Sequence, residues 1–380
     1  MKSYQSSILL LPPRSTSGAS YRGVATLGQA LLQYLLLAAF VFCFLPTRLD
    51  GQYVYITNQN DNTVSGYKIS STGALIAVPN SPFQTGSLPQ SIAVDRTGTF
   101  VYAGNANNDS VSGYRINSEG SLSPLSGSPF HTGTDPVWVT TNPAFNFAYV
   151  VSLPDSTLGA FSIGSEGQLT PVNGSPYPTG AFPFSAAVGF KGEFAYVANS
   201  TGNSISAFQI AHNGTLTPVV GSPFASGTSP RDVAISQKYP FVFVANSADN
   251  TVSMFQKADN GSLTPVTGSP FATGFLPFSL ALDRTSQFLY VVNGDSNTIS
   301  AFRVERSGSL TDLRGSPFPI GAGSIATDPL GPFLYVLNGN NAVSGYKIGS
   351  DGALTRVTGS PFPTGNAPVS ITITPTAHPK

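Results

Sequence analysis

The chain has 380 residues, of which 9% are charged and 41% are apolar, whereas about 25% charged residues are usual in a soluble protein. The apolar fraction is sufficient for a packed core and excludes a disordered, charge-driven chain. The 39 glycines and 31 prolines favour many short strands joined by tight turns. The formal net charge is zero and no run of lysines or arginines occurs, which excludes nucleic acid as a partner.

The first 50 residues differ from the rest and are predicted to direct export. Residues 1–29 contain three basic residues and no acidic one, and residues 30–45 are apolar except for Gln33 and Tyr34. A basic lead before such a run is typical of a signal peptide or an uncleaved anchor. We therefore expect an exported protein, periplasmic, extracellular or membrane-anchored, that meets a membrane only through this segment. The single cysteine, Cys43, lies within it, so the folded part has neither a disulfide nor a thiolate metal site.

From residue 51 onward the sequence is a repeat. An aromatic strand that ends in Asn or Ser recurs seven times, with starts at Tyr53, Phe100, Phe147, Phe194, Phe241, Phe288 and Phe333. The first six copies are 47 residues apart and the last follows after 45. A Ser-Pro-aromatic marker keeps a similar step, at Ser81, Ser128, Ser175, Ser222, Ser269, Ser316 and Ser360. Repetition at this period predicts a repeat architecture such as a solenoid or a propeller.

Each repeat holds four predicted strands. In the second repeat they are 91–95, 100–105, 111–116 and 122–125, with a Glu119-Gly120 turn before the last one. The strand at 100–105 is apolar on both faces, as expected where neighbouring blades of a propeller cover both faces of each sheet. The predicted fold class is therefore all-β: a seven-bladed β-propeller with four-stranded blades over residues 51–375, followed by a tail at 376–380.

The two ends of the repeat predict a closed ring. The first repeat begins at Tyr53 and lacks its opening strand, whereas residues 369–374 form an opening strand with no successor. The two pieces complete one blade, so the C-terminal strand 370–374 is expected to pair beside 53–58 in the N-terminal blade. Such closure removes sheet edges that would otherwise be exposed.

Two repeated polar features are predicted to be structural. The asparagines at the strand ends are expected to cap their own turns, as Asn readily does. The Ser-Pro-aromatic loops are expected to staple one blade to the next, with the aromatic ring buried between sheets. Near-identical copies in every blade favour a structural role, because a single site needs no sevenfold duplication.

The blade pattern resembles a known family. The strand Tyr/Phe-x-Tyr-Val-x-Asn, followed by a polar turn, Thr-Val-Ser-x-Phe and x-Gly-x-Leu, is similar to the lactonase-type propellers, which include 6-phosphogluconolactonase-like proteins and overlap the YVTN-repeat propellers. The resemblance covers residues 53–374. It implies a seven-bladed ring with activity at the channel mouth, where the family carries a Pro-Arg-His segment and an Asn-Glu pair.

The family's charged groups match this sequence only in part. The corresponding segment is Pro230-Arg231-Asp232, so Asp232 stands where the family pattern has histidine. No glutamate follows a strand-final Asn or Ser; these positions hold Gln59, Ala106, Leu153, Ser200, Ser247, Gly294 and Gly339. Arg231 is therefore the one site residue that the resemblance carries over.

Further candidate site residues are those at which one copy departs from the repeat. Serine is the usual second residue of the inner strand, and the departures are Trp138 and the pair Arg231-Asp232. A cation, a carboxylate and an aromatic face can hold a small sugar-like or anionic ligand. The alternative is a local Arg231–Asp232 ion pair with Trp138 filling the channel. His131, in an inter-blade loop, completes the predicted ligand-binding set, its alternative being an exposed loop histidine.

Metals and cofactors are not predicted. The three histidines lie on different features of the repeat and have no repeated ligand spacing. The sequence favours an exported propeller that acts as a binding or interaction scaffold, with a small sugar-like or anionic ligand, or a protein partner, at the channel mouth.

Two other functions remain open. One is hydrolysis of a sugar lactone, in which Arg231 holds the anionic group or the developing oxyanion and Asp232 acts as a base through water. The other is a cell-envelope structural protein that uses the rim of the channel for protein contacts.

Overall fold

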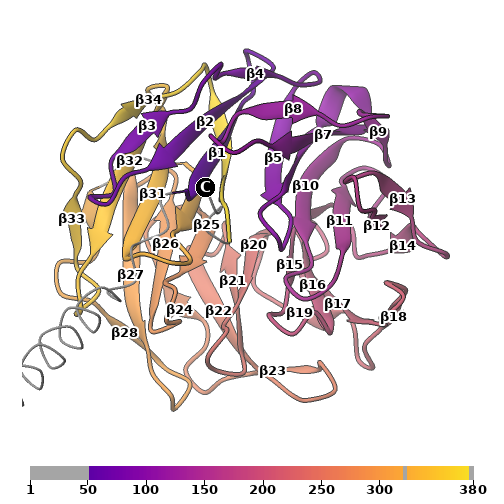
Figure 1. Ribbon diagram of the computed structural model, residues 1–380. Coiled ribbons are helices and arrows are strands. Elements are labelled where there is room, and N and C mark those ends of the chain that lie inside the picture. Colours follow the sequence, from indigo (N-terminus) through magenta and orange to yellow (C-terminus); the bar gives the residue numbers. More distant parts are fainter. Residues whose placement is uncertain (1–50, 320–322, 376–380) are drawn as a thin grey trace, which may run out of the picture. The chain divides into compact units, whose positions relative to one another are not determined.

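The computed structural model describes residues 51–319 and 323–375. The predicted export segment and the C-terminal tail lie outside the described residues. Within them the chain forms seven antiparallel sheets arranged in a ring (Figure 1). This confirms the predicted all-β, seven-bladed propeller. No helix in the described ranges is long and apolar enough to cross a membrane.

Blades are numbered here from the one that contains Tyr53. Blade 1 comprises β35 (Pro368–Ile373), β1 (Tyr53–Asn58), β2 (Thr63–Ile69), β3 (Leu75–Ala77) and β4 (Phe83–Gln84). Blade 2 comprises β5 (Pro89–Val94), β6 (Phe100–Asn105), β7 (Ser110–Ile116), β8 (Leu122–Pro124) and β9 (Phe130–His131), with the 3-10 helix η1 (Ala106–Asn108) between β6 and β7. Blade 3 comprises β10 (Pro136–Thr141), β11 (Phe147–Ser152), β12 (Thr157–Ile163), β13 (Leu169–Pro171) and β14 (Tyr177–Pro178).

The other four blades repeat this order. Blade 4 comprises β15 (Pro183–Val188), β16 (Phe194–Asn199), β17 (Ser204–Ile210), β18 (Leu216–Pro218) and β19 (Phe224–Ala225). Blade 5 comprises β20 (Pro230–Ile235), β21 (Phe241–Asn246), β22 (Thr251–Lys257), β23 (Leu263–Pro265) and β24 (Phe271–Ala272). Blade 6 comprises β25 (Pro277–Leu282), β26 (Phe288–Asn293), β27 (Thr298–Val304), β28 (Leu310–Asp312) and β29 (Phe318–Pro319). Blade 7 comprises β30 (Ile325–Thr327), β31 (Phe333–Asn338), β32 (Ala342–Ile348), β33 (Leu354–Arg356) and β34 (Phe362–Pro363).

The ring closes as the sequence predicts. β35 pairs antiparallel with β1, with Ile371 opposite Ile56 and Ile373 opposite Val54. Figure 1 shows this C-terminal strand beside the first strands of the chain. Ile371 and Ile373 of β35 are buried in the core that blades 1 and 7 share. Because the inner strand of blade 1 comes from the C-terminus, the two ends of the repeat hold each other in place.

Tyrosines of the second strands tie successive blades together. The hydroxyls of Tyr55, Tyr102, Tyr196, Tyr290 and Tyr335 each donate to the carbonyl oxygen of the turn glycine in the next blade, at 2.7–2.8 Å. The same turn also receives the first aromatic ring of that strand. At Gly120, where φ is +83°, a Cβ atom would lie 2.3 Å from the Tyr53 ring. Glycine is therefore required both for the backbone conformation and for the close approach of the neighbouring blade.

The strand-final asparagines are structural, as predicted, but they bond to side chains of the third strand. Asn58 is fully buried, and its Nδ2 donates to Thr63 Oγ1 and Ser65 Oγ, both at 2.9 Å. The same pair of bonds recurs at Asn105, Asn199, Asn246 and Asn293. These side chains join the second and third strands of one blade and are not available to a ligand.

The Ser-Pro-aromatic segments pack between blades, as predicted, since Phe83 lies in the core that blades 1 and 2 share. They also form a short strand that was not predicted. Each forms a two-residue fifth strand that pairs with the third strand of its own blade, and the serine hydroxyl accepts the N–H of that strand, as Ser81 does from Gly66 at 2.9 Å. A hydrogen bond adds to this contact between blades, because Tyr114 of the following blade donates to the Gln84 carbonyl at 2.6 Å. The fifth strand was not predicted because its pairing with the third strand spans about 20 residues and gives no local pattern.

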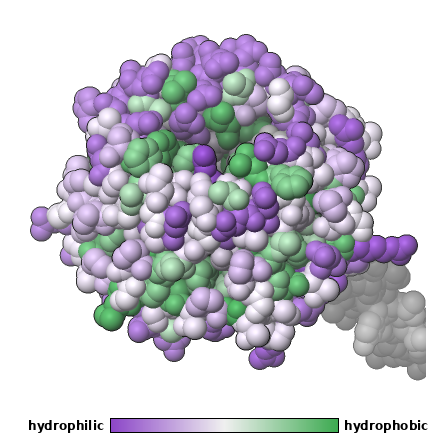
Figure 2. Space-filling model, turned by 180° about the vertical axis from the view of Figure 1, so that it is seen from behind, coloured by the Kyte–Doolittle hydropathy of each residue, from purple (hydrophilic) through white to green (hydrophobic). Residues whose placement is uncertain are grey.

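The surface of the described residues is mixed in hydropathy. Figure 2 shows residues of intermediate hydropathy over much of one face, with hydrophobic residues gathered beside a hollow. Only one ion pair joins described residues, between Arg115 and Glu166 at 2.5 Å.

Candidate functional site

The inner strands surround a central channel with a cavity of about 310 Å³. One layer of its wall is a ring of seven equivalent residues, the second residue that the sequence repeat places in each inner strand. Five are serines (Ser91, Ser185, Ser279, Ser324 and Ser370), and the other two are Trp138 and Asp232. All of them except Ser185 line the cavity. The two departures from the repeat thus lie in the same layer of the same cavity.

Two serines of this ring tie an inner strand to the next one. Ser370 Oγ accepts the N–H of Ile92 and Ser279 Oγ accepts the N–H of Ile325, each at 3.3 Å. Asp232 takes the same role between blades 5 and 6, because its Oδ2 accepts the N–H of Leu280 at 2.9 Å. Its other oxygen, Oδ1, accepts the N–H of Val233 at 2.9 Å.

Burial dominates the acid–base behaviour of Asp232. The side chain is 5% exposed, and desolvation raises the pKa of its carboxyl to about 7 in spite of the two backbone hydrogen bonds, which lower it. The Ser185 and Ser279 hydroxyls also lower this pKa. Asp232 can therefore change its protonation near neutral pH.

Arg231 occupies a β-bulge at the start of β20. The pairing of β20 with β21 shifts between Pro230 and Asp232, so Arg231 has no partner across the strand pair. Its guanidinium lies 4.4 Å from the centroid of the Phe184 ring, which is the bulge residue of blade 4. Neither Asp232 nor any other described carboxylate forms an ion pair with it. Stacking uses the face of the guanidinium and leaves its in-plane N–H donors for another acceptor.

Trp138 is fixed in the channel wall, half-buried. Its Nε1 donates to the carbonyl of Ala186 at 2.9 Å, which joins blade 3 to blade 4. The indole contacts the hydrophobic core between those blades. Trp138 and Asp232 therefore line one cavity, and Arg231 lies one residue nearer the start of the strand.

His131 is separated from this group. It is exposed on β9, where it pairs with Ser110 on β7, and it does not line the channel cavity. No group of three or more His, Cys, Asp or Glu residues in the described ranges has the arrangement of a metal site.

The serine hydroxyls are site residues that the sequence reasoning missed. Ser91 lines the channel cavity, and its buried Oγ has no hydrogen-bond partner among the described residues. Ser185 Oγ is also buried without such a partner, but Ser185 does not line the cavity. Ser185 is left unpaired because the N–H that would match it, that of Val233, is bound by Asp232. The sequence does show that serine recurs at this position of the inner strands. Recurrence in most blades indicated a structural role, so these serines were not predicted as site residues.

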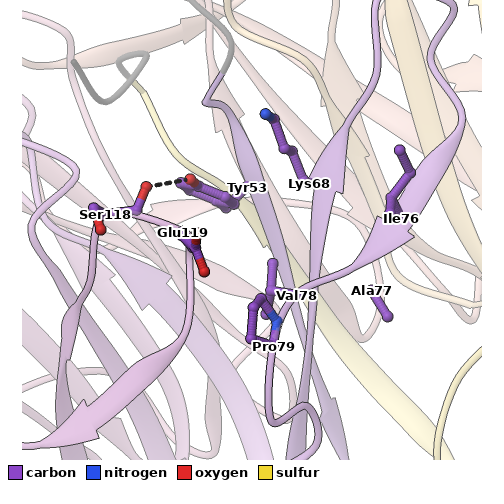
Figure 3. A pocket seen from close by; sticks show the side chains of 8 residues that line it. All are labelled: Tyr53, Lys68, Ile76, Ala77, Val78, Pro79, Ser118 and Glu119. Carbon is purple, nitrogen blue, oxygen red and sulfur yellow. Dashed lines mark hydrogen bonds between the residues drawn. The ribbon is translucent and has the colours of Figure 1, made fainter. Parts of the chain in front are cut away.

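A second pocket, of about 530 Å³, lies where blades 1 and 2 meet. Figure 3 shows Tyr53 between Lys68 and the Ser118-Glu119 turn. The Tyr53 hydroxyl donates to the Ser118 carbonyl at 2.9 Å. Burial, and then the Glu119 charge, raise the pKa of Tyr53. This phenol therefore stays neutral and joins two blades, and we assign the pocket no function.

The geometry defines a class of protein: a closed seven-bladed propeller with a polar, partly charged site in its central channel. The family model described as "Lactonase, 7-bladed beta-propeller" matches residues 46–139, 118–232 and 217–319. The chain belongs to this family.

Solved structures with the same fold include two putative 6-phosphogluconolactonases. The one from Bacteroides fragilis is 19% identical, with a TM-score of 0.75 over 86% of this chain and 99% of that one. The one from Bacteroides uniformis is 18% identical, with a TM-score of 0.75 over 85% and 99%. The periplasmic gluconolactonase of Pseudomonas aeruginosa is 17% identical, with a TM-score of 0.70 over 85% and 99%. At these identities the similarity shows the fold alone. No curated protein matches the sequence significantly.

Proposed function

We propose that the propeller binds a small polyhydroxylated anion, a sugar acid or a phosphorylated sugar lactone, at the mouth of its channel. The proposal rests on the guanidinium of Arg231, which has no ion-pair partner among the described residues. Arg231 is the one charged residue among the equivalent residues Gln90, Val137, Phe184, Arg231, Phe278, Gly323 and Val369, and its guanidinium stacks on Phe184 with no carboxylate partner among the described residues. A guanidinium so held can grip a carboxylate or phosphate through two parallel hydrogen bonds.

The layer below Arg231 suits the remainder of such a ligand. Hydroxyls of the serine ring both donate and accept hydrogen bonds, and one of those that line the cavity, Ser91, has no partner among the described residues. A cavity of about 310 Å³ is at the lower end of the range for small-molecule sites. A compact polyol therefore matches the site better than an extended apolar ligand does.

Binding is tested by calorimetric titration of the full-length protein with gluconate and with 6-phosphogluconate. Arg231→Ala is expected to raise the dissociation constant at least about tenfold, since a charge-assisted hydrogen bond contributes about 1.5–3 kcal/mol to binding. Arg303→Ala is a matched control, because Arg303 also stacks on a phenylalanine, Phe288, at 5.0 Å but belongs to a third strand away from the channel. Equal affinity in the wild type and in Arg231→Ala would rule out this site.

Lactone hydrolysis is the second candidate, favoured by the pKa of about 7 at Asp232 and by the family. In this reaction Asp232 accepts a proton from a water molecule whose oxygen adds to the lactone carbonyl, and Arg231 stabilises the oxyanion. The ring C–O bond then breaks, and the proton returns to the departing alkoxide to give a hydroxy acid. Turnover of 6-phosphogluconolactone that Asp232→Asn abolishes would establish catalysis. Binding without turnover would leave the scaffold function.

Export remains part of the proposal. It rests on the basic, acid-free lead and the apolar run of residues 1–45. Fractionation of cells that produce a tagged full-length chain is expected to place the protein in the periplasm, the medium or the membrane. An entirely cytoplasmic protein would contradict export, and a multimer in envelope fractions without ligand affinity would favour the structural alternative.

A further inference from the structure

Lys257 departs from the repeat at a core position. In the other six blades the last residue of the third strand is a buried aliphatic side chain: Ile69, Ile116, Ile163, Ile210, Val304 and Ile348. In blade 5 this residue is Lys257, and it is half-buried. Replacing a buried isoleucine with a cation sacrifices apolar burial. The blade fold therefore does not explain this lysine.

Lys257 lines a cavity of about 610 Å³ between blades 4 and 5. The cavity lies beside the turns that follow β15 and β20, at the end of these strands opposite to Arg231 and Asp232. A six-residue strand spans about 20 Å, so this cavity is separate from the channel mouth.

Two further lysines line the same cavity. Lys191 and Lys238 occupy equivalent positions in the turns after β15 and β20, where the matching residues of blades 2, 3, 6 and 7 are Thr97, Ala144, Thr285 and Leu330. Only five lysines occur in residues 51–375, so three of the five line one cavity. Such a concentration is notable in a chain with so little charge.

The ammonium groups of these three lysines can still bind an anionic group. Lys257 Nζ lies 5.2 Å from the Phe194 ring centroid and Lys238 Nζ lies 5.1 Å from that of Tyr239. None of the three forms an ion pair with a described residue. Glu193 and Asp259 also line the cavity, which leaves its lining with one net positive charge.

An apolar surface accompanies these charges. Phe190, in the turn after β15, lines the same cavity and is 62% exposed. The rings of Phe194 and Tyr239 also contribute to the lining. A ligand with a flat apolar part would remove this surface from water while its anionic group met the ammonium groups.

We propose that this cavity is a second binding site, for a small anion that carries an aromatic ring, such as an aryl phosphate or aryl carboxylate. Its anionic group lies among Lys191, Lys238 and Lys257, and its ring lies against Phe190 and Tyr239. This site is independent of the function proposed for the channel mouth.

The test measures the melting temperature of the full-length protein with phenyl phosphate and with inorganic phosphate. Phenyl phosphate at millimolar concentration is expected to raise the wild-type Tm by at least about 2 °C, and more than inorganic phosphate does. Lys257→Ile restores the repeat residue, so without ligand its Tm should rise by about 3–6 °C, while the response to phenyl phosphate disappears. Lys191→Ala should also lose the response.

Two controls separate this site from others. Lys347→Gln removes an exposed lysine from the third strand of blade 7 and introduces the residue found at that place in blades 4 and 5; it should keep the full response. Arg231→Ala should keep it as well, since Arg231 belongs to the channel mouth. A wild type that phenyl phosphate does not stabilise, or a Lys257→Ile variant that responds like the wild type, would overturn the proposal.

Discussion

At the scale of single residues, the same side-chain contact recurs at equivalent positions of several blades and is replaced by another in one or two of them. Asp232 illustrates the consequence, because it keeps the inter-blade hydrogen bond of the serine ring but adds a carboxyl that can ionise. An ionised carboxylate in this buried position is disfavoured by desolvation. The stability of the contact between blades 5 and 6, which Asp232 makes with the Leu280 N–H, is therefore expected to depend on pH.

The stability of the propeller should fall as pH rises from about 4 to about 7. Burial raises the pKa of Asp232 to about 7 in the folded protein, from an ordinary value of 3.8. Over this range the folded state retains a proton that the unfolded state has lost, so unfolding becomes easier as pH rises. Each pKa unit corresponds to about 1.4 kcal/mol, so the effect is on the order of 4 kcal/mol at most.

Asp232→Ser is the variant that checks this effect. Serine keeps an acceptor for the Leu280 N–H, as Ser279 does for Ile325, and removes the ionisable group. The variant should lose this component of the pH dependence and be more stable than the wild type above pH 7. Denaturant unfolding at several pH values measures both. Parallel pH profiles of the two proteins would show that Asp232 does not titrate as described.

Buried tyrosines offer a second test, with a matched pair. Tyr102 donates to the Gly167 carbonyl, whereas the buried Tyr149 hydroxyl has no hydrogen-bond partner among the described residues. Tyr102→Phe should lower the free energy of unfolding by about 1 kcal/mol, and Tyr149→Phe should change it by less than about 0.5 kcal/mol or increase it. Blade 5 already has phenylalanine, Phe243, at this place. Equal losses in the two variants would contradict this account.

At the scale of elements, the turn between the third and fourth strands connects one blade to the previous one. Gly120→Ala should be destabilising by about 1–3 kcal/mol or more, because alanine is strained at φ +83° and its Cβ would clash with the Tyr53 ring. Gly339→Ala is the control, since Gly339 is exposed and an added Cβ would meet no atom within 4 Å. Thermal unfolding compares them, and a Gly120→Ala variant as stable as Gly339→Ala would refute the required contact.

The sequence predicted the strands well and the short fifth strands poorly. Residues 91–95, 100–105, 111–116 and 122–125 correspond closely to β5, β6, β7 and β8, because each has apolar residues bounded by Gly or Asn turns. The two-residue strand β9 has no such pattern. It is defined by pairing with β7 across about 20 intervening residues, and such pairing is not visible in local sequence.

At the scale of the whole molecule, the C-terminal strand holds the ring together. A chain that ends at residue 365 lacks β35, which contributes the buried Ile371 and Ile373. Burial of two isoleucines stabilises by about 3–6 kcal/mol, and the truncation also exposes the edge of β1. The truncated chain should unfold at a much lower temperature than the full-length one or aggregate. An unchanged melting temperature would show that the ring closes without this strand.

Closure and the channel layer could be predicted from sequence, but the state of the site residues could not. The repeat numbering placed Trp138 and Asp232 in equivalent positions, and they line one cavity. The orientation of Arg231 depends on a bulge and on Phe184 of the preceding blade. The position of Lys257 in the repeat can be read from the sequence. That Lys257 lines one cavity with Lys191 and Lys238 depends on how two blades pack.

The central functional claim is that the one free guanidinium at the channel mouth anchors an anionic sugar. The most direct measurement is the electron density of crystals soaked with 6-phosphogluconate. We predict density in the channel mouth, with a carboxylate or phosphate oxygen within hydrogen-bond distance of Arg231 and hydroxyls directed at the serine ring. An empty mouth at ligand concentrations that saturate binding in solution, or density confined to the lysine-lined cavity between blades 4 and 5, would contradict the claim.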